Sequence, residues 1–543
     1  MPRPDARSPP STSAPVTDTS SAPAPSPAPA STHKGFGAAA ALRAALMVTG
    51  STYVAYAAGL IGSLLIARAL GPADYGRYAY LVWLGGLVVM FMNNGLTTTS
   101  IRYVSETLGR NDPAGVASLH RWFWLRQWAS IVVVAALLAL ALPLLQPAGW
   151  EGHLASVWLI VACASVPKAW YLFGISMAKG HGRFGIEAKT MSVLSLVNAA
   201  CIVALMLVDA DLDAFLALFV LSNLVHPLML ACMKDRVRAP VAPQPVDAGL
   251  AARVNNHYLW TALLTLMAVL YGPSMMVPFL NQHVGADAVG YFSVAMSLTR
   301  GGIELLSSGL NSVLMPLMSH GYGAGGQDRT LRIASNAVRV FHAFGLLLAG
   351  VGLFWAAPLV LTLYGAKYAE AVLSFQVLVV LGGLTLPYGV LATLLSTTDR
   401  QRVRTAVTGG SVLLFGAAAW WLIPQHGLDG ALLAYGGSAV VIHIAWMVVA
   451  VRVGGMTLPI GPMLRLTVAA LLSAGALAAP LWWIGGLLAP FVAGLAFVGL
   501  YIAATFWLRA WSAEDLAFLA EQTRRFGPLG RWTRALQRYA APA

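Results

Sequence analysis

Long apolar runs separated by short polar segments dominate this chain of 543 residues. A helix needs about 20 apolar residues to cross a hydrocarbon core of roughly 30 Å. Fourteen runs meet that length, which predicts an all-α polytopic membrane protein. The runs lie at about 41–66, 79–100, 128–147, 155–177, 187–208, 213–233, 257–280, 289–316, 337–363, 371–396, 403–424, 428–451, 463–486 and 490–508.

The composition supports a membrane protein and excludes a soluble enzyme. Charged residues make up 10% of the chain and hydrophobic residues 58%, whereas soluble domains carry roughly 25% charged residues. The net charge of +13 is spread thinly between the apolar runs, so nucleic acid is not expected as a partner. Cys163, Cys201 and Cys232 lie inside apolar runs, and neither a disulfide framework nor a metal site is expected.

The loops alternate in charge along the chain. Loops of one parity carry most of the basic residues: Arg102, Arg110, Arg121, Arg126, Lys179, Arg183, Lys189, Lys234, Arg236, Arg238, Arg253, Arg329, Arg332, Arg339, Arg400, Arg402, Arg404, Arg452 and Arg465. Loops of the other parity carry Arg68, Arg77 and Lys367 among acidic residues. Because cytoplasmic loops collect Lys and Arg, both termini are expected in the cytoplasm.

The two ends of the chain differ from the apolar body. Residues 1–36 are rich in Pro, Ser and Ala and are expected to form a disordered cytoplasmic tail. In the segment 510–543, beyond Pro528, apolar residues recur at helical spacing and arginines take the other face: Leu529, Trp532, Leu536 and Tyr539 against Arg531, Arg534 and Arg538. This pattern predicts an amphipathic helix on the cytoplasmic membrane surface, although a solvated charged tail would read similarly.

An internal repeat divides the body of the chain. A shift of 214 residues aligns Gly71 with Gly285, Gly76 with Gly290, Tyr78 with Phe292, Gly95 with Gly309 and Leu96 with Leu310. The alignment predicts an N-lobe at 37–233, a cytoplasmic linker at 234–256, a C-lobe at 257–452 and two further helices at 453–509. Chance alignment of glycines is the alternative. Two parallel lobes around a cavity are the arrangement that alternating access requires.

Charged residues inside the spans are candidate site residues, because charge is costly in hydrocarbon. Arg300 lies near the middle of its span, and a guanidinium suits bidentate phosphate recognition. Glu304, one turn later, could hold Arg300 in place or simply neutralise it. Lys168 is expected to face the cavity or to extend toward the cytoplasmic interface. Arg43 is a cavity candidate or a topology anchor.

Uncharged polar residues inside the spans complete the candidate site. His226 and His443 could titrate near neutral pH and couple transport to protons, although a core histidine is the commoner case. Asn93 and Asn94, with Thr97–Thr99, make one half of the second span polar. Such a segment forms a wet vestibule wall or bonds to neighbouring helices. No catalytic or cofactor motif is present, so we expect neither an enzyme nor a cofactor.

Four segments resemble one family. The stretch ALGPADYGRYA at Ala69–Ala79 resembles the LGPxDYGxYA signature of Wzx-type polysaccharide (O-antigen or exopolysaccharide) flippases of the MOP superfamily. Three further segments are similar to recurring segments of that family: VGYFS from Val289, LYGAKYA from Leu363 and LIPQHGLDGA from Leu422. The similarity covers about residues 40–455.

The resemblance implies two six-helix lobes, MOP- and MATE-like, with two additional C-terminal helices. It also implies translocation of undecaprenyl-pyrophosphate-linked oligosaccharide repeat units across the bacterial inner membrane, for lipopolysaccharide or exopolysaccharide synthesis. A cationic cavity containing Arg300 and Lys168 would bind the pyrophosphate or acidic sugars. Expected partners are the lipid-linked substrate, membrane lipids, a polysaccharide polymerase and a chain-length regulator.

Two other classes stay open. Fourteen helices are also typical of lipid II flippases, and another MOP-fold exporter would share the lobes. A cation-coupled multidrug exporter is disfavoured, because the first and seventh spans contain no Asp or Glu. A polysaccharide polymerase or ligase is disfavoured, because the outward loops are too short for a catalytic segment.

Overall fold

The structure is a computed structural model that describes residues 38–233, 248–270, 272–398, 400–481, 486 and 488–512. The described part is helical and contains no strand. The predicted tail at 1–36 lies outside the described residues, as do 234–247 of the linker and most of the predicted amphipathic helix at 510–543.

The helices fall into three groups along the chain. The first six are α1 (Ala38–Met92), α2 (Leu96–Gly109), α3 (Pro113–Ala141), α4 (Leu154–Gly180), α5 (Phe184–Leu207) and α6 (Leu212–Met233). The next seven are α7 (Ala248–Leu270), α8 (Met276–His283), α9 (Ala286–Thr299), α10 (Leu305–Leu363), α11 (Ala371–Leu384), α12 (Tyr388–Thr397) and α13 (Gln401–Arg452). A π-helix at Arg300–Glu304 joins α9 to α10. The last two are α14 (Ile460–Leu481) and α15 (Leu488–Trp507).

Within the described residues the helices make fourteen passes along the bundle, as the sequence predicts. The helices α1, α10 and α13 each fold back on themselves, at Gly71, at Gly325–Gly326 and at Gly427. Conversely, α7 with α8, and α11 with α12, are single passes with an interruption. Within the described residues, ten segments are long and apolar enough to cross a membrane, and some of these contain a fold-back.

Three passes expected as continuous helices are broken. The second pass is interrupted at Asn93–Gly95, the seventh around Gly272 and the tenth at Thr385–Pro387. Hydropathy does not detect such breaks, because two or three residues such as asparagine, glycine, threonine or proline leave a 20-residue average apolar. Interrupted spans are tolerated where neighbouring groups satisfy the freed backbone.

Several helices begin earlier than predicted, among them those of the third and seventh passes. The third pass starts at Pro113 rather than 128, because Asp112 caps it by accepting from the Gly115 amide at 2.8 Å and its first turns are polar. The seventh starts at Ala248, inside the segment expected as linker.

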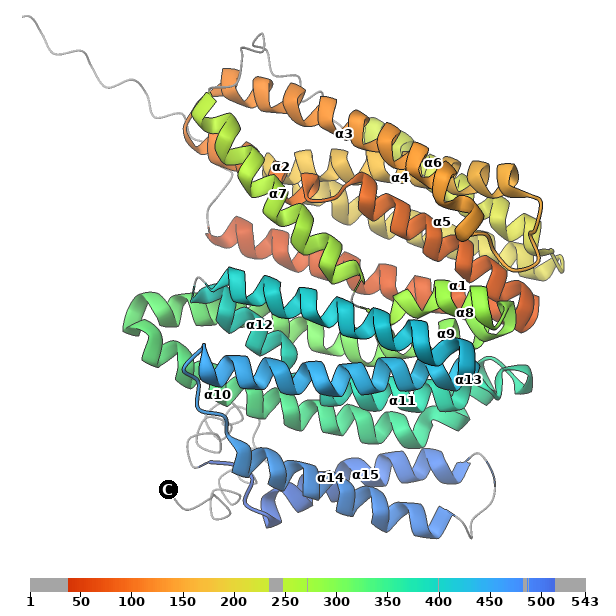
Figure 1. The fold of residues 1–543 in the computed structure, drawn as a ribbon, viewed down its shortest axis with the longest axis vertical. Coiled ribbons are helices and arrows are strands. Elements are labelled where there is room, and N and C mark those ends of the chain that lie inside the picture. The colour runs from red at the N-terminus through yellow and green to blue at the C-terminus, as the bar shows by residue number, and fades with distance from the viewer. Residues whose placement is uncertain are drawn as a thin grey trace, which may run out of the picture.

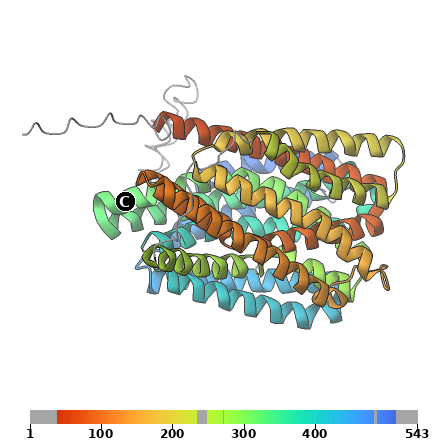
Figure 2. The ribbon, with the colours of Figure 1, turned by 90° about the horizontal axis from the view of Figure 1, so that it is seen from above.

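The helices form two lobes and an additional hairpin (Figure 1). Helices α1–α6 lie together, α8–α13 lie together beside them, and α14 and α15 pack against α10 at the far side. Helix α7 runs obliquely from α2 toward the second lobe. Seen from above, the passes lie roughly side by side (Figure 2).

The repeat-related glycines adopt corresponding conformations. Gly71 has φ 76° and ψ 177°, and Gly285 has φ 130° and ψ −179°. Both backbones favour glycine, and each starts the helical pass that faces the other lobe. This agreement supports two lobes related as the sequence repeat predicts.

The alternation of passes places the charges at two ends of the bundle. We call the end with Arg110, Arg183, Arg253, Arg400 and Arg452 the basic end. The opposite end, with Asp74, Glu151, Asp211, Asp287 and Glu370, is called the acidic end.

Candidate binding cavity

A cavity of about 560 Å³ lies between the two lobes. Helices α1 and α9 form its main walls, with contributions from α5, α7 and α8. Its polar lining residues are Ser63, Tyr75, Tyr78, Trp83, Asn198, Ser274, Ser293, Ser297 and Arg300. The cavity is therefore weakly polar, and Arg300 is the cationic residue in its lining.

The lobes meet closely beside this cavity, at the acidic end. A Cβ added to Gly76 would overlap the carbonyl oxygen of Ala286, and one added to Gly290 would overlap that of Pro72. The two repeat-related glycines thus mark the crossing of α1 and α9. Only residues without a side chain allow backbones to approach so closely.

Further contacts hold the lobes together at the acidic end. The side chain of Asn281 accepts from the Ala148 amide at 2.9 Å and donates to the Gln146 carbonyl at 2.9 Å. The Tyr368 hydroxyl donates to the Ala67 carbonyl at 2.8 Å. These bonds join segments far apart in sequence, so they hold the two lobes together at this end.

Arg300 stands where three cavities adjoin. Besides the inter-lobe cavity, it lines a cavity of about 440 Å³ beside α1 and another of about 380 Å³ within the C-lobe. It is the first residue of the π-helix, and Gly301 and Gly302 follow. Such π-turns within α-helical segments occur frequently at functional sites.

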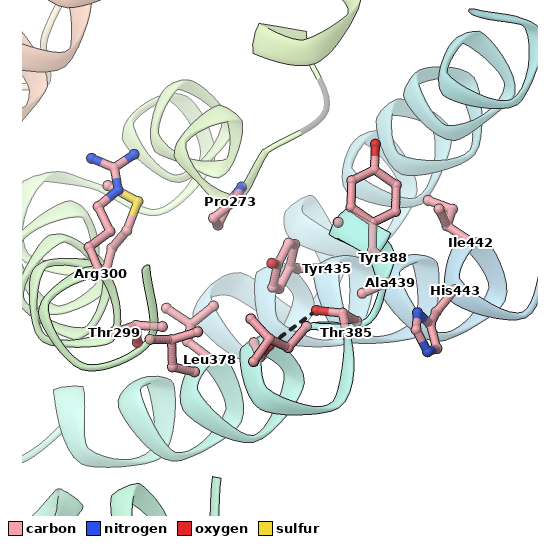
Figure 3. A pocket seen from close by; sticks show the side chains of 15 residues that line it. Pro273, Thr299, Arg300, Leu378, Thr385, Tyr388, Tyr435, Ala439, Ile442 and His443 are labelled. Atoms are coloured by element: carbon pink, nitrogen blue, oxygen red, sulfur yellow. Dashed lines mark hydrogen bonds between the residues drawn. The ribbon is translucent and has the colours of Figure 1, made fainter. Parts of the chain in front are cut away.

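The C-lobe cavity is lined by aromatic and hydroxyl side chains (Figure 3). Tyr388, Tyr435 and His443 come from α12 and α13, and the Thr385 hydroxyl donates to the Leu381 carbonyl at 2.8 Å. The Nδ1 atom of His443 is buried without a hydrogen-bond partner among the described residues. A role of His443 in proton coupling stays a prediction.

Lys168 and His226, considered separately in the sequence, form one pair inside the N-lobe. The Lys168 Nζ atom lies 2.7 Å from His226 Nε2. The other ring nitrogen faces the Ser222 carbonyl and must donate to it, so Nε2 accepts from the ammonium group. The Tyr171 ring lies 5.2 Å from the same Nζ. Lys168 is not part of the inter-lobe cavity lining.

Asn93 and Asn94 lie at the break between α1 and α2. Asn93 lines a further cavity of about 310 Å³, together with Lys179 and Glu187, whose side chains pair at 2.6 Å. Sequence reasoning missed this pair, since it assigned Lys179 to a loop and did not consider Glu187. The available signal was that Glu187 is the sole acid between Lys179 and Lys189.

Two predicted site residues, Arg43 and Glu304, are described by their backbone alone. Arg43 lies in the first turns of α1, and Glu304 ends the π-helix, but their side chains lie outside the described part of the structure. The Arg300–Glu304 pair stays a prediction. Across the described residues, no group of three or more His, Cys, Asp or Glu residues could hold a metal ion.

The fold is that of a MOP-superfamily membrane transporter. The lipid II flippase MurJ in an inward closed conformation matches with a TM-score of 0.66 and 12% identity, over 85% of this chain and 98% of that one. An inward-facing multidrug resistance MATE family transporter matches with a TM-score of 0.60 and 14% identity, over 72% and 93%. The Vibrio cholerae MATE transporter VcmN matches with a TM-score of 0.53 and 14% identity, over 76% and 96%.

The family is shown by sequence. The family model described as "Polysaccharide biosynthesis protein" matches residues 65–373, more than half of the chain, and the chain belongs to this family. No curated protein sequence matches the chain. The predicted kinship with Wzx-type proteins of the MOP superfamily is confirmed. The family and the fold neighbours are transporters and flippases rather than enzymes.

Proposed function

We propose that this protein translocates undecaprenyl-pyrophosphate-linked oligosaccharide repeat units across the bacterial inner membrane by alternating access. The observation that carries the proposal is the position of Arg300, at the junction of three cavities between and within the lobes. A guanidinium can bind two phosphate oxygens at once.

The sugar part of the substrate needs hydrogen-bond partners while it crosses the membrane. Each sugar hydroxyl costs several kcal/mol if it enters hydrocarbon unpaired, roughly 4–8 for transfer to an alkane. The inter-lobe cavity offers these hydroxyls hydrogen-bond partners while the substrate crosses the membrane. Its lining includes Ser63, Ser293, Ser297 and Asn198. The polyprenyl tail can remain in lipid, so no bond chemistry is needed.

The orientation follows from charge. The basic end carries most of the loop arginines and lysines, which are retained on the cytoplasmic side. We therefore place both termini and the basic end in the cytoplasm. The acidic end then faces the periplasm, where a polymerase and a chain-length regulator would receive the repeat units.

Deletion of the gene tests the translocation itself. Lipid-linked repeat units should accumulate on the inner leaflet, and surface polysaccharide should be lost. Normal surface polysaccharide in a strain without a paralogue would refute the proposal.

Variants of Arg300 test whether this residue binds the pyrophosphate of the substrate. Arg300→Ala should reduce export about 10- to 100-fold at normal protein level, because a hydrogen bond to a charged group contributes about 1.5–3 kcal/mol. Arg300→Lys should retain part of the export, since it keeps the charge but loses the fork. Arg332→Ala, an exposed arginine on α10, is the matched control. Full export by Arg300→Ala would remove this residue from the site.

A lipid II flippase is the second candidate. The fold likeness to MurJ extends over 85% of this chain, which favours a lipid-linked saccharide cargo of either kind. Chemical analysis of the glycolipid that accumulates in the deletion strain separates the two. A peptide-bearing disaccharide would support the second candidate, and a peptide-free oligosaccharide the first.

A further inference from the structure

A second polar cavity lies beside the inter-lobe cavity, at the break between α1 and α2. We call it the Asn93 cavity; it measures about 310 Å³, and its polar lining residues are Asn93, Thr97, Thr98, Ser176, Lys179, Glu187 and Thr265. Met90 lines both cavities. Thr265 lines this one and Val269, one helical turn along α7, lines the other. The two cavities are therefore neighbours.

The break itself has a steric cause. Gly95 has φ 71° and ψ −17°, a left-handed conformation that favours glycine. A Cβ there would stand 2.8 Å from the Ala262 amide nitrogen of α7. The carbonyl of Met92, next to the break, accepts from Gln127 Nε2 at 3.1 Å. The interruption is thus built into the packing of α3 and α7 around it.

Two buried oxygens of this cavity have no donor among the residues that the structure describes. Asn93 is 6% exposed, and its Nδ2 donates to the Val89 carbonyl at 3.2 Å. That bond fixes the orientation of the amide, and Oδ1 has no partner among the described residues. Glu187 contacts Lys179 Nζ through Oε1 at 2.6 Å, while its Oε2 is likewise buried without a partner.

Donor groups lie in the same lining. Lys179 contributes an ammonium group, and the first turn of α2, with Thr97 and Thr98, contributes a helix N-terminus without a side-chain cap. A bare cation would be repelled by Lys179 and by the positive end of α2. An anion would be repelled by Glu187. A hydroxyl group donates and accepts at once, so it can satisfy both sets.

We propose that the Asn93 cavity binds an uncharged, hydroxyl-rich sugar residue of the lipid-linked substrate while Arg300 holds its pyrophosphate. This inference rests on the proposed function and deepens it. The volume is at the lower limit of small-molecule pockets, about 300–1,000 Å³, and far exceeds the space of one water-sized ion, about 30 Å³. Neighbouring hydroxyls of one ring would meet Asn93 Oδ1 and the Glu187–Lys179 pair.

The test compares two ligands on the purified full-length protein in nanodiscs. One is the glycolipid from the deletion strain, and the other is undecaprenyl pyrophosphate without sugar. Asn93→Ala and Glu187→Gln should each weaken binding of the glycolipid by about fivefold or more, the worth of a lost hydrogen bond. Neither should weaken binding of the sugar-free lipid, whereas Arg300→Ala should weaken both.

The matched controls remove the same kinds of group, a carboxylate and an amide, at positions that do not line the Asn93 cavity. Asp112→Asn removes a carboxylate but keeps the cap of α3, and Asn256→Ala removes an exposed amide of α7. Both should bind the glycolipid like the wild type. Because each variant is judged by the ratio of its two affinities, a general loss of folded protein cancels.

The outcomes separate this inference from the proposed function. If the wild type binds neither ligand, the proposed function fails. If the wild type binds both, but Asn93→Ala and Glu187→Gln leave the ratio unchanged, the sugar site is overturned and Arg300 stands. Sodium binding by the wild type that Glu187→Gln abolishes would also overturn it, in favour of a cation site.

Discussion

The two ends of the bundle join the lobes by different means. At the acidic end the contacts involve backbone: Gly76 against the Ala286 carbonyl, and Asn281 with two backbone groups of the loop after α3. At the basic end α7 packs on α2 and α3 partly through buried apolar side chains such as Val254 and partly through half-exposed polar side chains. There, Arg253 pairs with Glu106 at 2.8 Å, and Arg126 donates to Asn255 at 3.2 Å.

This difference has an energetic consequence. Close backbone packing loses its stabilisation abruptly when helices separate, because interiors are nearly as dense as crystals. Exposed ion pairs contribute about 0–1 kcal/mol each and exchange readily with water. The polar contacts at the basic end can therefore exchange at low cost, whereas separation of the backbone contacts at the acidic end needs a driving force such as substrate binding.

The largest effect is expected from Gly76→Ala. Its methyl group would overlap the carbonyl oxygen of Ala286, a backbone atom that cannot rotate away. Overpacking of this kind costs about 1–3 kcal/mol, so the melting temperature should fall and export should be lost.

The control for Gly76→Ala is Gly416→Ala on α13, where a Cβ would meet nothing within 4 Å. It should be as stable as the wild type. Accessibility gives a second measurement: a cysteine at Ser63, in the cavity lining, should react faster with an impermeant thiol reagent added at the acidic end when Gly76→Ala is present. Unchanged melting and unchanged labelling would contradict a tight acidic end.

A smaller effect is expected from Asn281→Ala. The change leaves the Gln146 carbonyl and the Ala148 amide without their bonds to this side chain. Because both residues are half-buried and water can replace the lost partner, the cost should be about 0.5–1.5 kcal/mol. Thermal unfolding measures the loss. Gln282→Ala, the exposed neighbour, should have no effect. An equal response of the two variants would show that Asn281 does not join the lobes.

The sequence could predict the helices and the repeat, because both depend on apolar runs and on glycine. The repeat pairs Gly76 with Gly290, which lie at the contact between α1 and α9, and it pairs Gly71 with Gly285, whose backbones both have a positive φ. Fourteen passes followed from length alone. The breaks at Asn93–Gly95 and Thr385–Pro387 did not, since they depend on how neighbouring helices pack.

The candidate site was predictable only in part. Arg300 could be singled out, because a charge within an apolar run is rare. The pairing of Lys168 with His226, 58 positions apart, and that of Lys179 with Glu187 across a turn could not, because side-chain contacts depend on the rotation of each helix. That the Oδ1 atom of Asn93 has no donor among the described residues could not be predicted either, because it follows from the bond that the amide nitrogen makes to the Val89 carbonyl.

The smallest effect is expected at the basic end, where Glu106→Gln, Arg253→Gln and the double variant form a mutant cycle. The two side chains are 25% and 49% exposed, so solvent screens their attraction, and the coupling free energy should be about 0.2–1 kcal/mol. Thermal unfolding at low and high salt measures it, and high salt should reduce it further.

Arg110 also pairs with Glu106, so Arg110→Gln in the same cycle separates the two partners. A coupling of about 3 kcal/mol, as found when buried ion pairs are broken, would show that the polar contacts of the basic end hold as firmly as the backbone contacts of the acidic end, and would remove this difference between the two ends.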